Sequence, residues 1–171
     1  MNLIIKFIGA FFMVIGTTLL GRTFAKTYKD RVEFLKDFNK RLEILKNEIG
    51  FMKGILSDAI EKSGEFQGKA KDLFADVLEN LIDMEAGAAW EDACEKRLKN
   101  MELKKEDIDT IKSLGRLLGS TDVEGQITNI EVISGQLSIL ADKAEEERKK
   151  NEPLFKNIGP VVGVGISVLL M

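Results

Sequence analysis

Carboxylate pairs and a single cysteine are the residues of this chain whose types could do chemistry. Glu91 and Asp92 are adjacent, and Asp107 and Asp109 lie two positions apart, which would allow acid–base work if a pocket held them. Cys94 would need a base to act as a nucleophile, and the sequence contains no histidine. The lack of histidine also removes the commonest metal ligand. We therefore expect no enzyme activity, cofactor or metal site, with the carboxylates on surface helices and Cys94 in an ordinary core position.

A polar corner between two helices is a better candidate for function. Apolar residues recur at helical spacing up to Leu118, and Gly119 can take the left-handed conformation that ends a helix. Thr121 and Glu124 then have the spacing of a capping box, which would start the next helix. Asp122 falls in the first turn of that helix, where the helix dipole favours a negative charge. The pattern predicts a helical hairpin. The polar residues near its tip are Arg116, Asp122 and Gln126.

The N-terminal stretch predicts a membrane segment. Residues 3–21 are apolar or small apart from Lys6, and a helix of 19 residues is long enough to cross the hydrocarbon core of about 30 Å. Basic residues are more numerous after the stretch than before it, with Arg22, Lys26, Lys29 and Arg31 following. The positive-inside rule then places the rest of the chain in the cytoplasm. A cleaved signal peptide is the alternative, although Arg22 crowds the cleavage site that it would need.

The C-terminal stretch predicts a second, shorter membrane segment. Residues 157–171 carry no charge and would form a helix of about 22 Å, which residues 154 and 155 can lengthen. Gly159, Gly163 and Ser167 form a stripe of small residues that allows another transmembrane helix to approach closely. A buried core helix or an apolar tail is the alternative.

Between these ends, the spacing of apolar residues predicts a soluble helical bundle. Seven apolar residues follow a 3-4 spacing on the first long helix: Leu35, Phe38, Leu42, Leu45, Ile49, Met52 and Leu56. Flanking residues widen the stripe to that of a bundle helix: Phe34, Arg41, Ile44, Phe51 and Ile55. Further helices are expected over residues 57–62, 68–83, 86–98 and 121–151, besides the one that ends at Gly119. In the last of these, Glu145 with Lys149 and Glu146 with Lys150 have the spacing of surface ion pairs.

The predicted fold is all-α, an antiparallel bundle of about five to six helices flanked by two membrane segments. We place the N-terminal segment at 1–25, the cytoplasmic bundle at 26–152 and the C-terminal segment at 153–171. The 44% of apolar residues suffice for one core, and the net charge of −3 does not indicate nucleic-acid binding. One cysteine allows no internal disulfide, which fits a reducing compartment.

The corner segment also carries a resemblance. Its pattern LG-x-x-LG-x-x-D-x-x-x-Q resembles the stage III sporulation protein AB family of endospore-forming Firmicutes, and the likeness spans nearly the whole chain, including a segment centred on Trp90. The matching positions are Leu114, Gly115, Leu118, Gly119, Asp122 and Gln126. We interpret the leucines and glycines as packing and turn residues. Asp122 and Gln126, with their neighbour Arg116, are interpreted as partner-binding residues or as ties within the hairpin. The family tends to have prolines after the first long helix, and residues 53–57 have none.

The resemblance implies a function that the spacing of residues does not show. The cytoplasmic domain of the family is similar to the helical domain of the type II secretion F platform protein. The chain would then be a noncatalytic platform subunit in the mother-cell membrane that surrounds the forespore. Its partners would be a motor ATPase and other membrane proteins of a transenvelope complex, and oligomerisation is compatible with this role. A membrane-anchored helical signalling or adaptor module is the alternative, and an enzyme is a third hypothesis.

Overall fold

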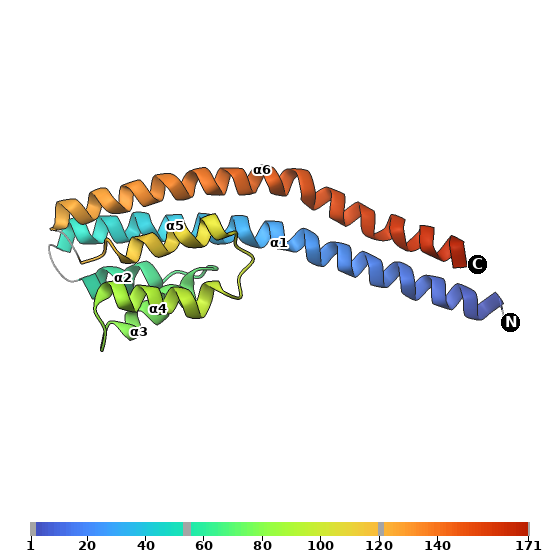
Figure 1. Cartoon of the computed structure of the whole chain (residues 1–171), viewed down its shortest axis with the longest axis horizontal. Coiled ribbons are helices and arrows are strands. Elements are labelled where there is room, and N and C mark those ends of the chain that lie inside the picture. The colour runs from blue at the N-terminus through green and yellow to red at the C-terminus, as the bar shows by residue number, and fades with distance from the viewer. Residues whose placement is uncertain (1–2, 53–55, 120–121, 171) are drawn as a thin grey trace. The chain divides into compact units, whose positions relative to one another are not determined.

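The structure contains helices joined by turns and loops, with no strands over the residues that it describes. It is a computed structural model that describes residues 3–52, 56–119 and 122–170 (Figure 1). Its six helices over these residues are α1 (Leu3–Met52), α2 (Leu56–Gly64), α3 (Lys71–Asn80), α4 (Ala86–Leu98), α5 (Lys105–Gly115) and α6 (Val123–Leu170). The predicted all-α fold is confirmed.

The chain divides into two compact units. Unit 1 contains residues 1–30 and 143–171, and unit 2 contains residues 31–142. The limits of the membrane segments, placed after residue 25 and before residue 153, stay predictions. The last helix was expected to end near Asn151, but α6 continues through Pro153 and Pro160. A proline removes one backbone hydrogen bond yet has a φ that suits a helix. Ala144 and Gly159 are both buried, so packing on either side of Pro153 offsets that loss.

In unit 1 the two ends of the chain form an antiparallel pair of helical segments joined by small residues (Figure 1). A Cβ added to Gly159 would lie 2.6 Å from the carbonyl oxygen of Thr17, and one added to Gly163 would lie 2.8 Å from the Cα of Val14. The Ser167 hydroxyl lies 3.4 Å from the carbonyl oxygen of Ala10. The predicted stripe of small residues therefore packs against another helix, which is the N-terminal part of α1.

The core of unit 2 is built on the apolar stripe of α1. Leu35, Phe38, Leu42 and Leu45 are fully buried, as their spacing predicted. Phe51 is different, because 88% of its surface is exposed. It lies two residues after a buried position of the stripe, Ile49, and two residues turn an α-helix by roughly 200°, toward the opposite face. The expectation that Phe51 flanks the stripe is wrong.

Three aromatic rings lie at the centre of this core. The ring centroids of Phe38, Phe74 and Trp90 are 5.6 Å to 6.0 Å apart, and the Trp90 ring meets both phenylalanines edge-on. Such edge-to-face contacts are favourable beyond the area that they bury. Trp90 is fully buried, so the prediction that it is a core residue is confirmed.

A buried ion pair joins α1 to the beginning of α5. Arg31 donates from Nε and Nη2 to the two carboxylate oxygens of Asp107, at 2.7 Å and 3.0 Å. Asp107 also accepts the backbone N–H of Lys104 at 2.8 Å, and its side chain has no exposed surface. The sequence-based view of Asp107 as a surface carboxylate is therefore wrong. Arg31 belongs to the core of unit 2 rather than to the basic residues that follow the membrane segment, because the pair can be buried only when both charges are matched.

A second buried arginine holds the connection between α2 and α3. Arg41 donates to the carbonyl oxygens of Ser63 and Phe66 at 2.7 Å and 2.6 Å, and to Asp37 at 3.1 Å. Asp37 in turn accepts the backbone N–H of Ala70 at 2.8 Å. These bonds satisfy a buried guanidinium and fix the loop on α1.

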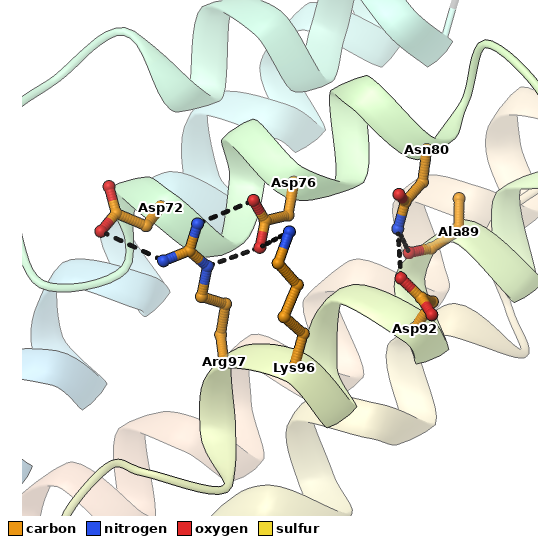
Figure 2. Close-up of polar contacts among 7 residues, drawn as sticks. All are labelled: Asp72, Asp76, Asn80, Ala89, Asp92, Lys96 and Arg97. Carbon is orange, nitrogen blue, oxygen red and sulfur yellow. Dashed lines mark hydrogen bonds and ion pairs between the residues drawn. The ribbon is translucent and has the colours of Figure 1, made fainter.

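Polar contacts also join α3 to α4 (Figure 2). Arg97 donates to both oxygens of Asp76, Lys96 lies 3.3 Å from the same carboxylate, and Asn80 donates to Asp92 and to the carbonyl oxygen of Ala89. Hydrogen bonding from Arg97 lowers the pKa of Asp76 below its usual value. Asp76 therefore stays ionised at neutral pH. The stability that its lowered pKa contributes to the folded state is lost only as the pH falls through that pKa.

Candidate interaction site between α5 and α6

The glycine at the end of α5 is required by close packing against α4. The Trp90 indole N–H donates to the carbonyl oxygen of Ile111 at 2.9 Å, which holds the Cδ1 edge of the ring against the last turn of α5. A Cβ on Gly115 would lie 2.7 Å from Cδ1 of Trp90, and one on Gly87 would lie 3.0 Å from the Gly115 carbonyl oxygen. Gly115 thus has the packing role that was predicted for it. The sequence did not predict that its packing partner is Trp90.

The chain then turns through residues 116–119. Regular helix ends at Gly115 rather than at Gly119, and the amides of Leu117 and Leu118 both donate to the Leu114 carbonyl oxygen, at 2.9 Å and 3.1 Å. Gly119 has a φ of +71°, which confirms the predicted left-handed conformation. Leu114 and Leu118 are buried, so the apolar members of the motif anchor the turn in the core.

Asp122 begins α6. Its carboxylate accepts the backbone N–H of Gly125 at 2.9 Å, and its carbonyl oxygen accepts that of Gln126 at 2.9 Å. This is the geometry of an N-cap, one position earlier than the first-turn place expected from the sequence. The predicted capping box involves Thr121, which lies outside the described residues. Asp122 is exposed and Gln126 is half-buried.

A cleft of about 530 Å³ opens between α4 and α5 beside the turn. Its lining residues are Gly87, Glu91, Asp109, Lys112, Gly115 and Arg116. Glu91 and Asp109 therefore face one cleft, whereas their sequence partners are used elsewhere, Asp92 by Asn80 and Asp107 by Arg31. The carboxylate pairs seen in the sequence are not pairs in space. Among the residues that the structure describes, no group of acidic and cysteine side chains could hold a metal ion.

Comparison with known proteins identifies the family. A family model described as stage III sporulation protein AB matches residues 6–171. The chain belongs to the stage III sporulation protein AB family. It is 29% identical over 171 residues to the stage III sporulation protein AB of Bacillus subtilis (strain 168), an alignment that covers 98% of this chain and 99% of that protein.

A solved structure of a stage III sporulation protein AB confirms the fold. It matches with a TM-score of 0.65 at 22% identity, over 71% of this chain and 98% of that chain. The resemblance inferred from the corner segment is therefore correct at the level of family and fold. The roles assigned to Arg116, Asp122 and Gln126 as partner-binding residues stay predictions, since the family name does not test them.

The single cysteine of this sporulation family member lies in the core. Cys94 is fully buried on α4, and burial raises the pKa of its thiol to about 12. At pH 8 the thiol is therefore almost entirely protonated, and the thiolate is the reactive form.

We therefore expect N-ethylmaleimide to leave Cys94 unmodified in the folded protein at pH 8 for at least an hour. Intact-mass spectrometry checks this, with the same reaction in guanidinium chloride as the control, where labelling should be complete within minutes. Fast labelling of the folded chain would show that α4 opens readily and would contradict the burial described here.

Proposed function

We propose that the chain is a noncatalytic membrane platform subunit of a sporulation transenvelope complex between mother cell and forespore. In this role it couples a cytoplasmic motor ATPase to the membrane complex. The observation that carries the proposal is that the motif contains both packing residues and exposed polar residues. Its leucines and glycines are used by the fold, whereas Arg116 is exposed, and Asp122 is exposed although its carboxylate also caps α6. Exposed polar residues beside a turn suit partner contact.

The surface of unit 1 supports a membrane location. Within the described residues, α1 is the one helix that is long and apolar enough to span a membrane. Large apolar side chains are also exposed along the C-terminal part of α6, including Val161, Val164, Val168 and Leu169. Contiguous exposed apolar surface of this kind is rare on soluble proteins, which favours contact with lipid. The C-terminal span stays a prediction.

Unit 2 supports a role in binding rather than in catalysis. Its buried charged groups are engaged in structural contacts, as Arg31, Arg41 and Asp107 show, and Cys94 is enclosed. The positive-inside rule favours a cytoplasmic position for this unit, and in the proposed mother-cell role a motor ATPase would meet it there.

Two substitutions of Asp122 separate partner contact from capping. Asparagine is as good an N-cap as aspartate, so Asp122→Asn should change the free energy of unfolding by less than about 0.5 kcal/mol. Asp122→Lys removes the cap as well as reversing the charge, and should cost about 1 kcal/mol. If the carboxylate contacts the partner, both variants should lose capture of the ATPase, measured by crosslinking and affinity purification from sporulating cells.

Thermal unfolding followed by circular dichroism gives the control measurement for both variants. If the Asp122→Asn variant captures the ATPase as well as the unsubstituted chain does, the only role of the Asp122 carboxylate is to cap α6. Stable crosslinks to signalling proteins in place of an ATPase and secretion-like membrane proteins would favour the adaptor alternative.

A further inference from the structure

The exposed apolar surface of unit 1 ends at exposed basic residues. Along α1 the outward side chains are large and apolar up to Leu20: Phe7, Ile8, Phe11, Phe12, Ile15, Leu19 and Leu20. Arg22 follows directly and is exposed, and Lys26 is exposed one turn later on the same face. The first exposed cations therefore follow the apolar run directly, with the exposed ring of Phe24 between Arg22 and Lys26.

The packing of unit 1 puts basic residues of α6 on the same side of that boundary. Gly21 packs against Phe155 and Gly159, so Arg22 is level with the beginning of the apolar part of α6. At about 1.5 Å per residue, Lys26 lies about 6 Å beyond Arg22, and Lys150 about 12 Å beyond Ile158. The distance to Lys26 spans the headgroup layer. The distance to Lys150 reaches into the water beyond that layer, within about one Debye length of it.

The acidic residues of unit 1 do not cancel this charge. Lys6 lies at the other end of the apolar stretch, and the rest of unit 1 has eight basic and five acidic residues, a net charge of +3. Unit 2 has 16 basic and 23 acidic residues, a net charge of −7. Arg148 bonds to Glu145 at 2.6 Å, and Glu152 accepts from Arg148 at 3.3 Å and from Lys156 at 2.6 Å. The hydrogen bond from Lys156 lowers the pKa of Glu152.

The sequence predicted an ion pair between Glu145 and Lys149, but Glu145 instead accepts a hydrogen bond from Arg148. Lys149 and Lys150 are both exposed.

Aromatic side chains lie at the same level. The rings of Phe24 and Tyr28 each lie 5.8 Å from the ring of Phe155, centroid to centroid, between the apolar surface and the exposed lysines of α6. Tyr28 is the one member of this cluster with a polar tip, and tyrosine favours the layer where hydrocarbon meets headgroups. The cluster thus marks the depth at which lipid phosphates would meet Arg22 and Lys26.

We propose that Arg22, Lys26, Lys149 and Lys150 form a basic belt that binds the headgroups of anionic phospholipids. The inference rests on the proposed membrane location of unit 1. Arg22 and Lys26 contact lipid phosphates at the edge of the hydrocarbon, and Lys149 and Lys150 add long-range attraction. The belt selects anionic lipid around the protein and holds the helical pair at a set depth.

The test uses the full chain reconstituted in phosphatidylcholine vesicles. Electron paramagnetic resonance of spin-labelled phosphatidylglycerol or phosphatidylcholine measures how strongly each lipid associates with the protein. We expect phosphatidylglycerol to be preferred, and Arg22→Gln combined with Lys26→Gln to lower that preference about fivefold or abolish it. The matched control is Lys99→Gln combined with Lys105→Gln, which removes two exposed charges from unit 2 and should leave the preference unchanged. The preference should also fall between about 0.01 M and 1 M salt.

Carbonate extraction of the same vesicles separates the two proposals. An inserted protein with no preference for phosphatidylglycerol, or with equal loss in the control variant, overturns the basic belt and leaves the membrane location standing. A protein that carbonate removes from the vesicles overturns both.

Discussion

Replacing Trp90 by alanine should lower the free energy of unfolding of unit 2 by about 3–5 kcal/mol. Trp90 is fully buried between Phe38 and Phe74, and it supplies the surface on which Gly115 rests. Its removal leaves a cavity at the point where α4 supports the corner before α6. Since domains are stable by only about 5–15 kcal/mol, this is a substantial part of the stability expected of unit 2.

Urea unfolding of the full chain in mild detergent, followed by circular dichroism, measures this loss. Trp90→Phe is the control, because it keeps a ring in the aromatic cluster but loses the hydrogen bond to Ile111, and it should cost clearly less. Equal losses for the two variants would mean that the hydrogen bond, rather than the packing of the ring, dominates.

The second large effect is expected at the buried ion pair. Asp107→Ala should destabilise unit 2 by about 3–5 kcal/mol, because it removes the buried partner of the Arg31 guanidinium and leaves the half-exposed carboxylate of Glu106, at 3.5 Å, in its place. Loss of the bond to the Lys104 amide adds to the effect at the start of α5. Denaturant unfolding under the same conditions gives the measurement.

Asp109→Ala is the matched control, since it removes an exposed carboxylate two residues along the same helix and should change stability by less than about 0.5 kcal/mol. Arg31→Met combined with Asp107→Leu should recover much of the loss, because two apolar side chains remove the need to bury charge. A double variant as unstable as Asp107→Ala would show that capping of α5, and not the ion pair, is what the fold needs.

Part of the interaction site was predictable because turns are encoded locally. Gly119 adopts the left-handed conformation expected of a glycine after an apolar helical stretch. The reason for a glycine at position 115 is not local. A Cβ there would collide with Trp90, which lies on another helix. Asp122 differs, because its cap bond to the amide of Gly125 is local, yet its sequence context also allowed a place in the first turn.

Charge placement was the least predictable property. Asp107 and Asp109 look alike in the sequence, yet only Asp107 is buried, because Arg31, which lies 76 positions earlier, meets it. Phe51 shows the converse, an apolar residue left exposed because the face of α1 on which it lies is not covered. Burial depends on what the neighbouring helices present, and single-helix spacing carries no information about that.

The sequence by itself determined the helical class, the stripe of α1 that forms the core, the stripe of small residues on α6 and the turn at Gly119. These follow from the 3.6-residue period and from backbone sterics, which act over a few neighbouring residues. Only the tertiary structure decided which helix the small residues meet, which charges are buried and which stay exposed. Those outcomes depend on contacts between residues far apart in the chain, where desolvation and close packing choose among many pairings that the sequence alone leaves equal.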